Sequence, residues 1–380
     1  MSGHVTQFAP TLPRWSPTAW LAGATMGTYL LVAAGTVTAL APAHLALGAL
    51  VFAALLVALA RRLESETAGT EPDRDAATDR DPAPAPAETA PDGPLGVARA
   101  YVELTKPKLA WLLCLVALAS MALVPGPSLD PRTAIPTLAG GVLAVGASGT
   151  FNSVLERDVD RRMERTADRP LPTDRVPVRN ALAFGAALTL ASAATFVAFV
   201  NALAAALALC AILFYSVVYT LVLKPNTTRN VVLGGAVGAF PALIGWAAVT
   251  GSVGLPAIAL GAVVFLWTPA HFYNLALAYE DDYANGGVPM LPVVRGESTA
   301  RKHVLLYLGA TLLGAVALGA VTSLGWLYAA TTVVVGGGFL WAVVRLHRER
   351  TDGAAFRAFH ASNAYLGSLL LAIVVDAGVL

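Results

Sequence analysis

Long apolar runs recur along almost the whole of this chain of 380 residues, and they decide what it can fold into. Each run is about 20 residues long, the length that an α-helix needs to cross a bilayer core of about 30 Å. Only 13% of the residues are charged and 56% are hydrophobic, so a soluble globular fold is excluded. The sequence predicts an all-α polytopic membrane protein.

Apolar length predicts eleven spans, near residues 20–42, 44–60, 109–126, 135–156, 180–200, 202–223, 230–251, 255–278, 303–324, 326–346 and 358–380. Between the second and third spans, residues 63–94 hold nine acidic and two basic residues, abundant Pro and Ala, and no periodic apolar face. This composition is typical of a disordered linker. We therefore expect a two-helix transmembrane extension at 1–62, the acidic linker at 63–94, and a nine-helix body at 95–380.

Basic residues fall almost entirely on one side of these spans. If the N-terminus is cytoplasmic, 24 of the 25 Lys and Arg residues lie in cytoplasmic segments and only Arg132 lies outside. The positive-inside rule therefore predicts a cytoplasmic N-terminus, and a site for polar substrates at the cytoplasmic surface. The formal net charge of +1 gives no reason to expect a nucleic-acid partner. Cys114 and Cys210 lie inside apolar runs and indicate neither a disulfide framework nor a metal site.

The fourth span runs into an acidic motif. Asn152, Glu156 and Asp160 are spaced at i, i+4 and i+8, so on a helix they share one face over about 12 Å. Four arginines accompany them: Arg157, Arg161, Arg165 and Arg169. Oxygen ligands beside arginines suit a hard cation together with phosphate groups. The alternative is a charged helix end with i,i+4 salt bridges.

A second acidic group follows the eighth span, where Glu280, Asp281 and Asp282 are adjacent and His271 precedes them by one to three turns. A solvated loop is one interpretation and a second metal site is the other. The recurrence of acidic clusters on one membrane face favours the metal site. Lys106, Lys224 and Arg229 lie at span ends on the same face and could clamp anionic groups, although single lysines there often only anchor a helix.

The stretch NSVLERDVDRRMERTADRPLP resembles the first aspartate-rich motif of the UbiA superfamily of intramembrane prenyltransferases. Within that superfamily, ERDVDRRMERT, GGAVGAFPALIGWAAVTG, WTPAHF and DDYANGGVPMLPVV together are similar to the protoheme farnesyltransferases. The resemblance covers residues 95–380 and leaves the extension unexplained. The chain departs from the pattern at Ser153 and Glu156, where Asp is usual, and at Glu280, where related enzymes often have a basic residue.

The resemblance implies a nine-helix UbiA-type bundle that transfers a farnesyl group from farnesyl diphosphate to a vinyl group of heme B, with Mg²⁺ as cofactor. The catalytic and metal-binding residues that it implies are Asn152, Glu156, Asp160, Asp281 and Asp282. Diphosphate-binding candidates are Lys106, Arg165, Arg169, Lys224 and Arg229. Candidates for contact with heme or the prenyl chain are His271, Trp267, Tyr219 and Phe272.

Two alternatives stay open. A related prenyltransferase would use the same diphosphate site for a quinone precursor or an archaeal glyceryl lipid, but WTPAHF and PMLPVV argue against that acceptor. A transporter would place its acids near the bilayer midplane, whereas these acids lie at helix ends.

The extension carries no charged side chain within its helices, which favours packing, or docking with another membrane enzyme of the heme pathway. The expected location is the cell membrane.

Overall fold

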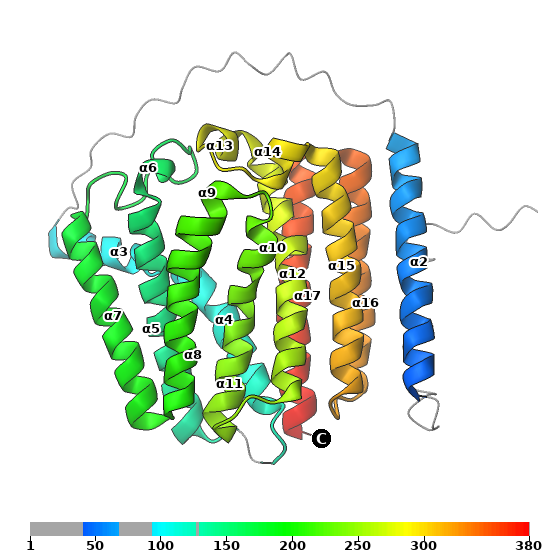
Figure 1. Cartoon of the computed structure of the whole chain (residues 1–380), viewed down its shortest axis with the longest axis horizontal. Helices are drawn as coiled ribbons and strands as arrows, with labels where there is room; N and C mark the ends of the chain where they lie inside the picture. Colours follow the sequence, from blue (N-terminus) through cyan, green and yellow to red (C-terminus); the bar gives the residue numbers. More distant parts are fainter. Residues whose placement is uncertain (1–40, 68–92, 127–128, 380) are drawn as a thin grey trace, which may run out of the picture.

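The computed structural model describes residues 41–67, 93–126 and 129–379 and shows an all-helical bundle (Figure 1). The first helix of the described part is α2 (Ala41–Thr67). The body contains, in chain order, α3 (Gly93–Leu104), α4 (Pro107–Ala122), α5 (Pro131–Leu155), α6 (Arg157–Asp160), α7 (Val178–Phe199), α8 (Ala202–Leu213), the π-helix η2 (Phe214–Leu223), α9 (Lys224–Asn226), α10 (Asn230–Gly234), the 3₁₀-helix η3 (Gly235–Ala239), α11 (Phe240–Thr250), α12 (Leu255–Ala278), α13 (Glu280–Asn285), α14 (Leu291–Arg295), α15 (Glu297–Ala320), α16 (Trp326–Glu349) and α17 (Asp352–Val379).

The predicted membrane-spanning body agrees with the structure. Among the described residues, eight helical segments are long and apolar enough to cross a membrane, and α3 with α4, which are bent by 46°, make nine if the pair counts as one span. The first predicted span, near 20–42, lies outside the described residues except for its last two positions. The short helices α6, α9, α13 and α14 gather at one end of the bundle (Figure 1). We call this end the polar face.

The second predicted span, near 44–60, falls within the helix α2, and the segment predicted as a linker overlaps a helix at each end. Helix α2 continues through Thr67 and α3 already begins at Gly93, so the outer residues of the segment 63–94 are helical. The reason is packing. Leu63 is fully buried and extends the buried face of α2, whose other members are Phe52, Leu56 and Leu59. This face packs on α15 and α16.

Capping groups set several helix starts. Proline occupies the first turn of α4 and of α5, where its missing N–H costs nothing. The Asp130 carboxylate accepts from the Arg132 N–H at the start of α5, and Asn201 accepts from the Ala204 N–H at the start of α8. At the start of α16 the cap comes from another helix. Asp376 of α17 is buried and accepts from the N–H groups of Gly325 and Tyr328.

Small residues let the helices approach closely, as is common in membrane bundles. The glycine-rich segment at 234–238 does this, since a Cβ on Gly235 would lie 3.2 Å from the Phe265 carbonyl oxygen of α12. The tightest helix–helix approach to backbone is elsewhere. A Cβ on Gly245 of α11 would lie 2.2 Å from the Ala117 carbonyl oxygen of α4. Since α4 also forms part of the cavity wall described below, this contact fixes one side of the site.

We therefore expect Gly245→Ala to destabilise the protein. The added methyl group meets backbone, which cannot rotate away, so α4 and α11 must separate at a cost of about 1–3 kcal/mol. The measurement is the thermal unfolding midpoint of purified protein in detergent. Gly338→Ala on α16 is the matched control, because a Cβ there meets nothing within 4 Å. Equal midpoints for the two variants would contradict the assigned α4–α11 contact.

Candidate active site

The first acidic motif lies at the polar face, where α5 passes into α6. Helix α5 ends at Leu155, but the bonds from Glu156 N–H to the Asn152 oxygen (2.9 Å) and from Asp160 N–H to the Glu156 oxygen (2.7 Å) continue the helical path. Asn152, Glu156 and Asp160 are only 2%, 6% and 2% exposed. Buried polar side chains need partners, so their surroundings define the site.

Each of the three side chains meets a basic residue from outside its own helix. Lys106, between α3 and α4, donates through Nζ to Asn152 Oδ1. Lys224 Nζ lies 2.6 Å from Glu156 Oε1. Arg169 Nη1 donates to both oxygens of Asp160, at 2.9 and 3.1 Å. We call these six residues the ionic cluster. None of these three pairs is an i,i+4 salt bridge, so the cluster is a built site and not a solvated helix end.

In the ionic cluster three basic side chains face two carboxylates and one amide. Burial raises the pKa of Glu156, but the ammonium groups of Lys224 and Lys106 and the hydrogen bonds from Lys224 and Asn152 outweigh burial and hold that pKa below its ordinary value. Glu156 is therefore ionised at neutral pH. The geometry suits an anionic ligand that is bound together with a cation.

The second acidic motif meets the loop that follows the first one. Asp282 of α13 is buried, and its two carboxylate oxygens accept from the N–H groups of Glu164 (2.9 Å) and Arg165 (3.0 Å). Asp281 is exposed. Asp282 therefore ties α13 to the loop that carries Arg165, a contact that the sequence analysis missed because the partners are backbone groups 117 and 118 residues away.

The side chain of Arg165 packs beside two tyrosines. Its guanidinium lies 5.0 Å from the ring centre of Tyr279 and 5.9 Å from that of Tyr283. Its Nε is buried and has no hydrogen-bond partner among the described residues, so it is available to an acceptor such as a phosphate oxygen. Arg229, in contrast, is exposed before α10, and within the described part of the chain its side chain forms no ion pair with the ionic cluster.

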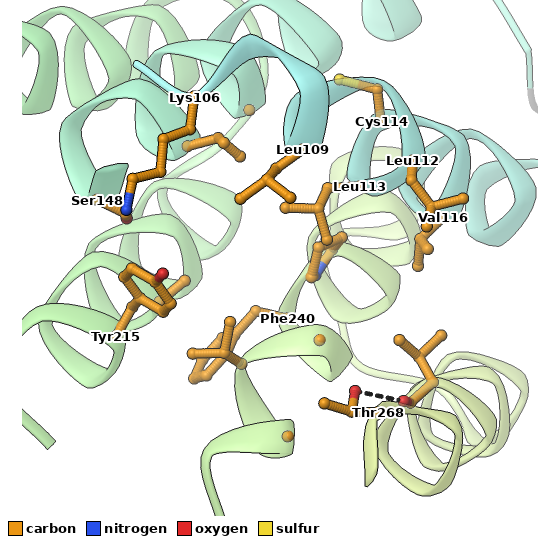
Figure 2. Close-up of a pocket in the computed structure, with 18 of the residues that line it drawn as sticks. Lys106, Leu109, Leu112, Leu113, Cys114, Val116, Ser148, Tyr215, Phe240 and Thr268 are labelled. Atoms are coloured by element: carbon orange, nitrogen blue, oxygen red, sulfur yellow. Dashed lines mark hydrogen bonds between the residues drawn. The ribbon is translucent and has the colours of Figure 1, made fainter. Parts of the chain in front are cut away.

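A largely apolar cavity of about 390 Å³ begins at Lys106 and runs between α4, α5, η2, α12 and α17. Figure 2 shows Lys106 extending toward Ser148, with Tyr215 on the facing wall. All four residues predicted to contact heme or the prenyl chain line this cavity: Tyr219, Trp267, His271 and Phe272. The rings of Tyr215 and Tyr219 stack with centroids 5.4 Å apart. One cavity thus runs from Lys106, the residue of the ionic cluster that lines it, to His271.

His271 is fixed on three sides. Its ring stacks between Trp267 and Phe359, with centroids 4.2 and 4.4 Å away. Its Nδ1 lies 2.7 Å from Ser362 Oγ, and Ser362 Oγ donates its single hydrogen to the Phe359 carbonyl oxygen. The hydroxyl must therefore accept from Nδ1–H, which leaves the lone pair of the imidazole on Nε2. Ser362 and Phe359 come from α17 and were not predicted.

The donor atoms of the ionic cluster fit Mg²⁺. Asn152, Glu156 and Asp160 offer hard oxygen donors, two of them carboxylates. In the described ranges, no group of three or more His, Cys, Asp or Glu residues could hold a metal ion. Mg²⁺ takes one or two carboxylates from a protein and completes its shell with substrate phosphates and water.

Comparison with known proteins points to one family. A sequence model of the UbiA prenyltransferase family matches residues 112–369. The protein "Protoheme IX farnesyltransferase" of Haloarcula marismortui is 60% identical over 355 residues, which cover 91% of this chain and 76% of the relative. "Protoheme IX farnesyltransferase 1" of Natronomonas pharaonis is 62% identical over 353 residues, which cover 91% of this chain and 77% of the relative.

Solved structures share the fold. A UbiA homologue from Archaeoglobus fulgidus bound to DMAPP and Mg²⁺ has a TM-score of 0.55 and 19% identity, covering 74% of this chain and 99% of that one. A digeranylgeranylglyceryl phosphate synthase has a TM-score of 0.58 and 17% identity, covering 74% and 98%. The family match spans more than half of the sequence and agrees with the helical bundle. The chain therefore belongs to the UbiA prenyltransferase family.

Proposed function

We propose that this prenyltransferase transfers a farnesyl group from farnesyl diphosphate to a vinyl group of heme B, which makes heme O. The observation that carries the proposal is the single cavity that joins Lys106 of the ionic cluster to the fixed ring of His271. A site with a cationic end and an apolar body fits a prenyl diphosphate, and an immobilised imidazole fits a metalloporphyrin. The names of relatives at 60% and 62% identity support this acceptor.

The diphosphate binds at the ionic cluster. Three basic side chains each donate to a carboxylate or amide oxygen: Lys106, Lys224 and Arg169. Each can exchange that oxygen for a phosphate oxygen. Arg165 adds a buried Nε that has no hydrogen-bond partner among the described residues. The exchange frees Asn152, Glu156 and Asp160, which would hold Mg²⁺. When bound, Mg²⁺ neutralises charge on the leaving diphosphate. Asp281 and Asp282 stay candidates for a second metal position.

The chemistry breaks the bond between C1 of the farnesyl group and the diphosphate oxygen, and it forms a carbon–carbon bond from C1 to the outer carbon of the vinyl group. The positive charge then lies on the vinyl carbon next to the porphyrin ring, where a water molecule adds its oxygen and releases one proton. The cluster cations stabilise the electron pair that leaves with the diphosphate. The farnesyl carbon becomes an allylic cation, which water would quench, so an apolar wall is required. The stacked rings of Tyr215 and Tyr219 face the cavity near Lys106 and stabilise positive charge there through their π-electrons.

The porphyrin binds at the other end of the cavity. We assign His271 Nε2 as the ligand of the heme iron, because Nδ1–H is committed to Ser362 and the lone pair therefore lies on Nε2. Stacking against Trp267 and Phe359 prevents the ring from turning away. A fixed iron ligand also fixes the position of the vinyl groups at the porphyrin edge, which is what a regioselective transfer requires.

The orientation of the site follows from charge. The ionic cluster lies at the polar face, and 24 of the 25 basic residues fall on that side if the N-terminus is cytoplasmic. The proposed location is the cell membrane, with the diphosphate site open to the cytoplasm. Helix α2 packs on α15 and α16, away from the cavity wall, which is consistent with a packing role. Docking of another heme-pathway enzyme on the extension stays a prediction.

We expect membranes that contain the protein to convert heme B and farnesyl diphosphate into heme O when Mg²⁺ is present. Asp160→Asn should lower the rate of this reaction about 100-fold. The substitution removes the charge that pairs with Arg169 and that would bind Mg²⁺. Asp158→Asn is the matched control, since Asp158 is two residues away and exposed. The product is identified by mass spectrometry. Prenylation of an aromatic acid or a glyceryl lipid in place of heme would refute the proposed acceptor.

We expect His271→Ala to weaken heme binding at least about tenfold and to abolish the absorption spectrum of a nitrogen-ligated iron. The measurement is a titration of purified protein in detergent with ferric heme B, without prenyl diphosphate. Added imidazole should restore the spectrum by filling the space of the lost side chain. His303→Gln is the control, because His303 bonds the Thr299 carbonyl and does not line the cavity. An unchanged spectrum in His271→Ala would exclude iron ligation.

A further inference from the structure

Thr220 is a buried hydroxyl behind the ionic cluster, and it does not line the cavity. It lies in the π-helix η2 (Phe214–Leu223), whose turns are wider than those of an α-helix. Its Oγ1 donates to the Tyr215 carbonyl oxygen, five residues earlier, at 2.8 Å. In an α-helix a threonine bonds the carbonyl four residues back. The π-helix therefore selects a different carbonyl and points the oxygen of Thr220 toward α5.

The partner on α5 is Asn152, whose Nδ2 donates to Thr220 Oγ1 at 3.0 Å. Donor and acceptor rules permit one orientation of this amide. Lys106 Nζ donates to Asn152 Oδ1. Thr220 has already used its hydrogen on Tyr215, so it can only accept from Nδ2. A rotated amide would place its N–H groups against the Lys106 ammonium and leave Thr220 without a donor.

We propose that Thr220 is a positioning residue that holds the Asn152 amide with its oxygen toward the metal and the diphosphate. This inference rests on the proposed function, since it assumes that Asn152 Oδ1 is a metal ligand. Thr220 touches neither substrate in this arrangement and acts through Asn152. The same π-helix stacks Tyr215 on Tyr219, and Gly234 makes room for it, because a Cβ there would lie 2.3 Å from Tyr219 Cδ2. The π-helix η2 thus positions both Thr220, which bonds Asn152 of the ionic cluster, and the stacked rings of Tyr215 and Tyr219, which line the cavity.

The test replaces the hydroxyl by a methyl group of similar size. With Thr220→Val, Mn²⁺ as a probe for the Mg²⁺ site should bind about tenfold more weakly, measured by electron paramagnetic resonance with inorganic pyrophosphate and without prenyl donor or heme. The Mg²⁺ concentration for half-maximal activity should rise by a similar factor. Thr220→Ser keeps the hydroxyl and should restore both values. Thr332→Val on α16 is the control, because Thr332 is buried and bonds only the Tyr328 carbonyl within the described structure.

A double-variant cycle isolates the positioning role. In an Asn152→Asp background both side-chain oxygens are equivalent, so orientation no longer matters and Thr220→Val should change Mn²⁺ binding less than about twofold. A tenfold loss in that background, or an equal loss in Thr220→Ser, would overturn the inference. If Asn152→Ala weakens Mn²⁺ binding while Thr220→Val does not, the inference fails and the proposed metal site stands. If Asn152→Ala has no effect, both fail.

Discussion

The burial of an ionic cluster at the ends of membrane helices is the constraint on which the rest of this structure depends. A buried charge is tolerated only when it is paired and hydrogen-bonded, so Glu156 and Asp160 require Lys224 and Arg169 beside them. These partners come from α9 and from the loop after α6. Lys106 adopts a left-handed conformation with φ of 51°, which costs about 1 kcal/mol. Its bond to Asn152 offsets that strain, and Pro107, which has no N–H to donate, breaks the helix between α3 and α4.

Local sequence patterns predicted two features of the structure that depend on neighbouring residues alone. Apolar length gave the spans of the body, and the i, i+4, i+8 spacing placed Asn152, Glu156 and Asp160 on one helical path. The clamp by Asp282, in contrast, depends on backbone N–H groups that have no residue signature. The extra turn of α2 beyond the predicted boundary depends on a surface of α15 and α16 that must first exist.

The roles of His271 and Thr220 show the same limit more sharply. Both residues are visible in the sequence, but their chemistry is set by partners 91 and 68 residues away, Ser362 and Asn152. Ser362 decides which imidazole nitrogen carries the proton, and Thr220 decides which atom of the amide faces Lys106. A π-helix cannot be read from apolar periodicity, because apolar side chains occupy most positions of Phe214–Leu223. Tertiary hydrogen bonds therefore complete a site that the sequence only outlines.

The carboxylates of the ionic cluster are paired with cations of the same cluster, and this pairing determines how ligands bind. A metal ion alone would have to displace Lys224 and Arg169 from the carboxylates, and a diphosphate alone would have to leave those carboxylates without their cations. Either change creates uncompensated buried charge, which is costly. When both ligands arrive together, the cations move to phosphate oxygens and the carboxylates move to the metal, so every charge keeps a partner. The cluster thus favours a metal–diphosphate complex over either ion alone, and the affinity for each ligand depends on the presence of the other.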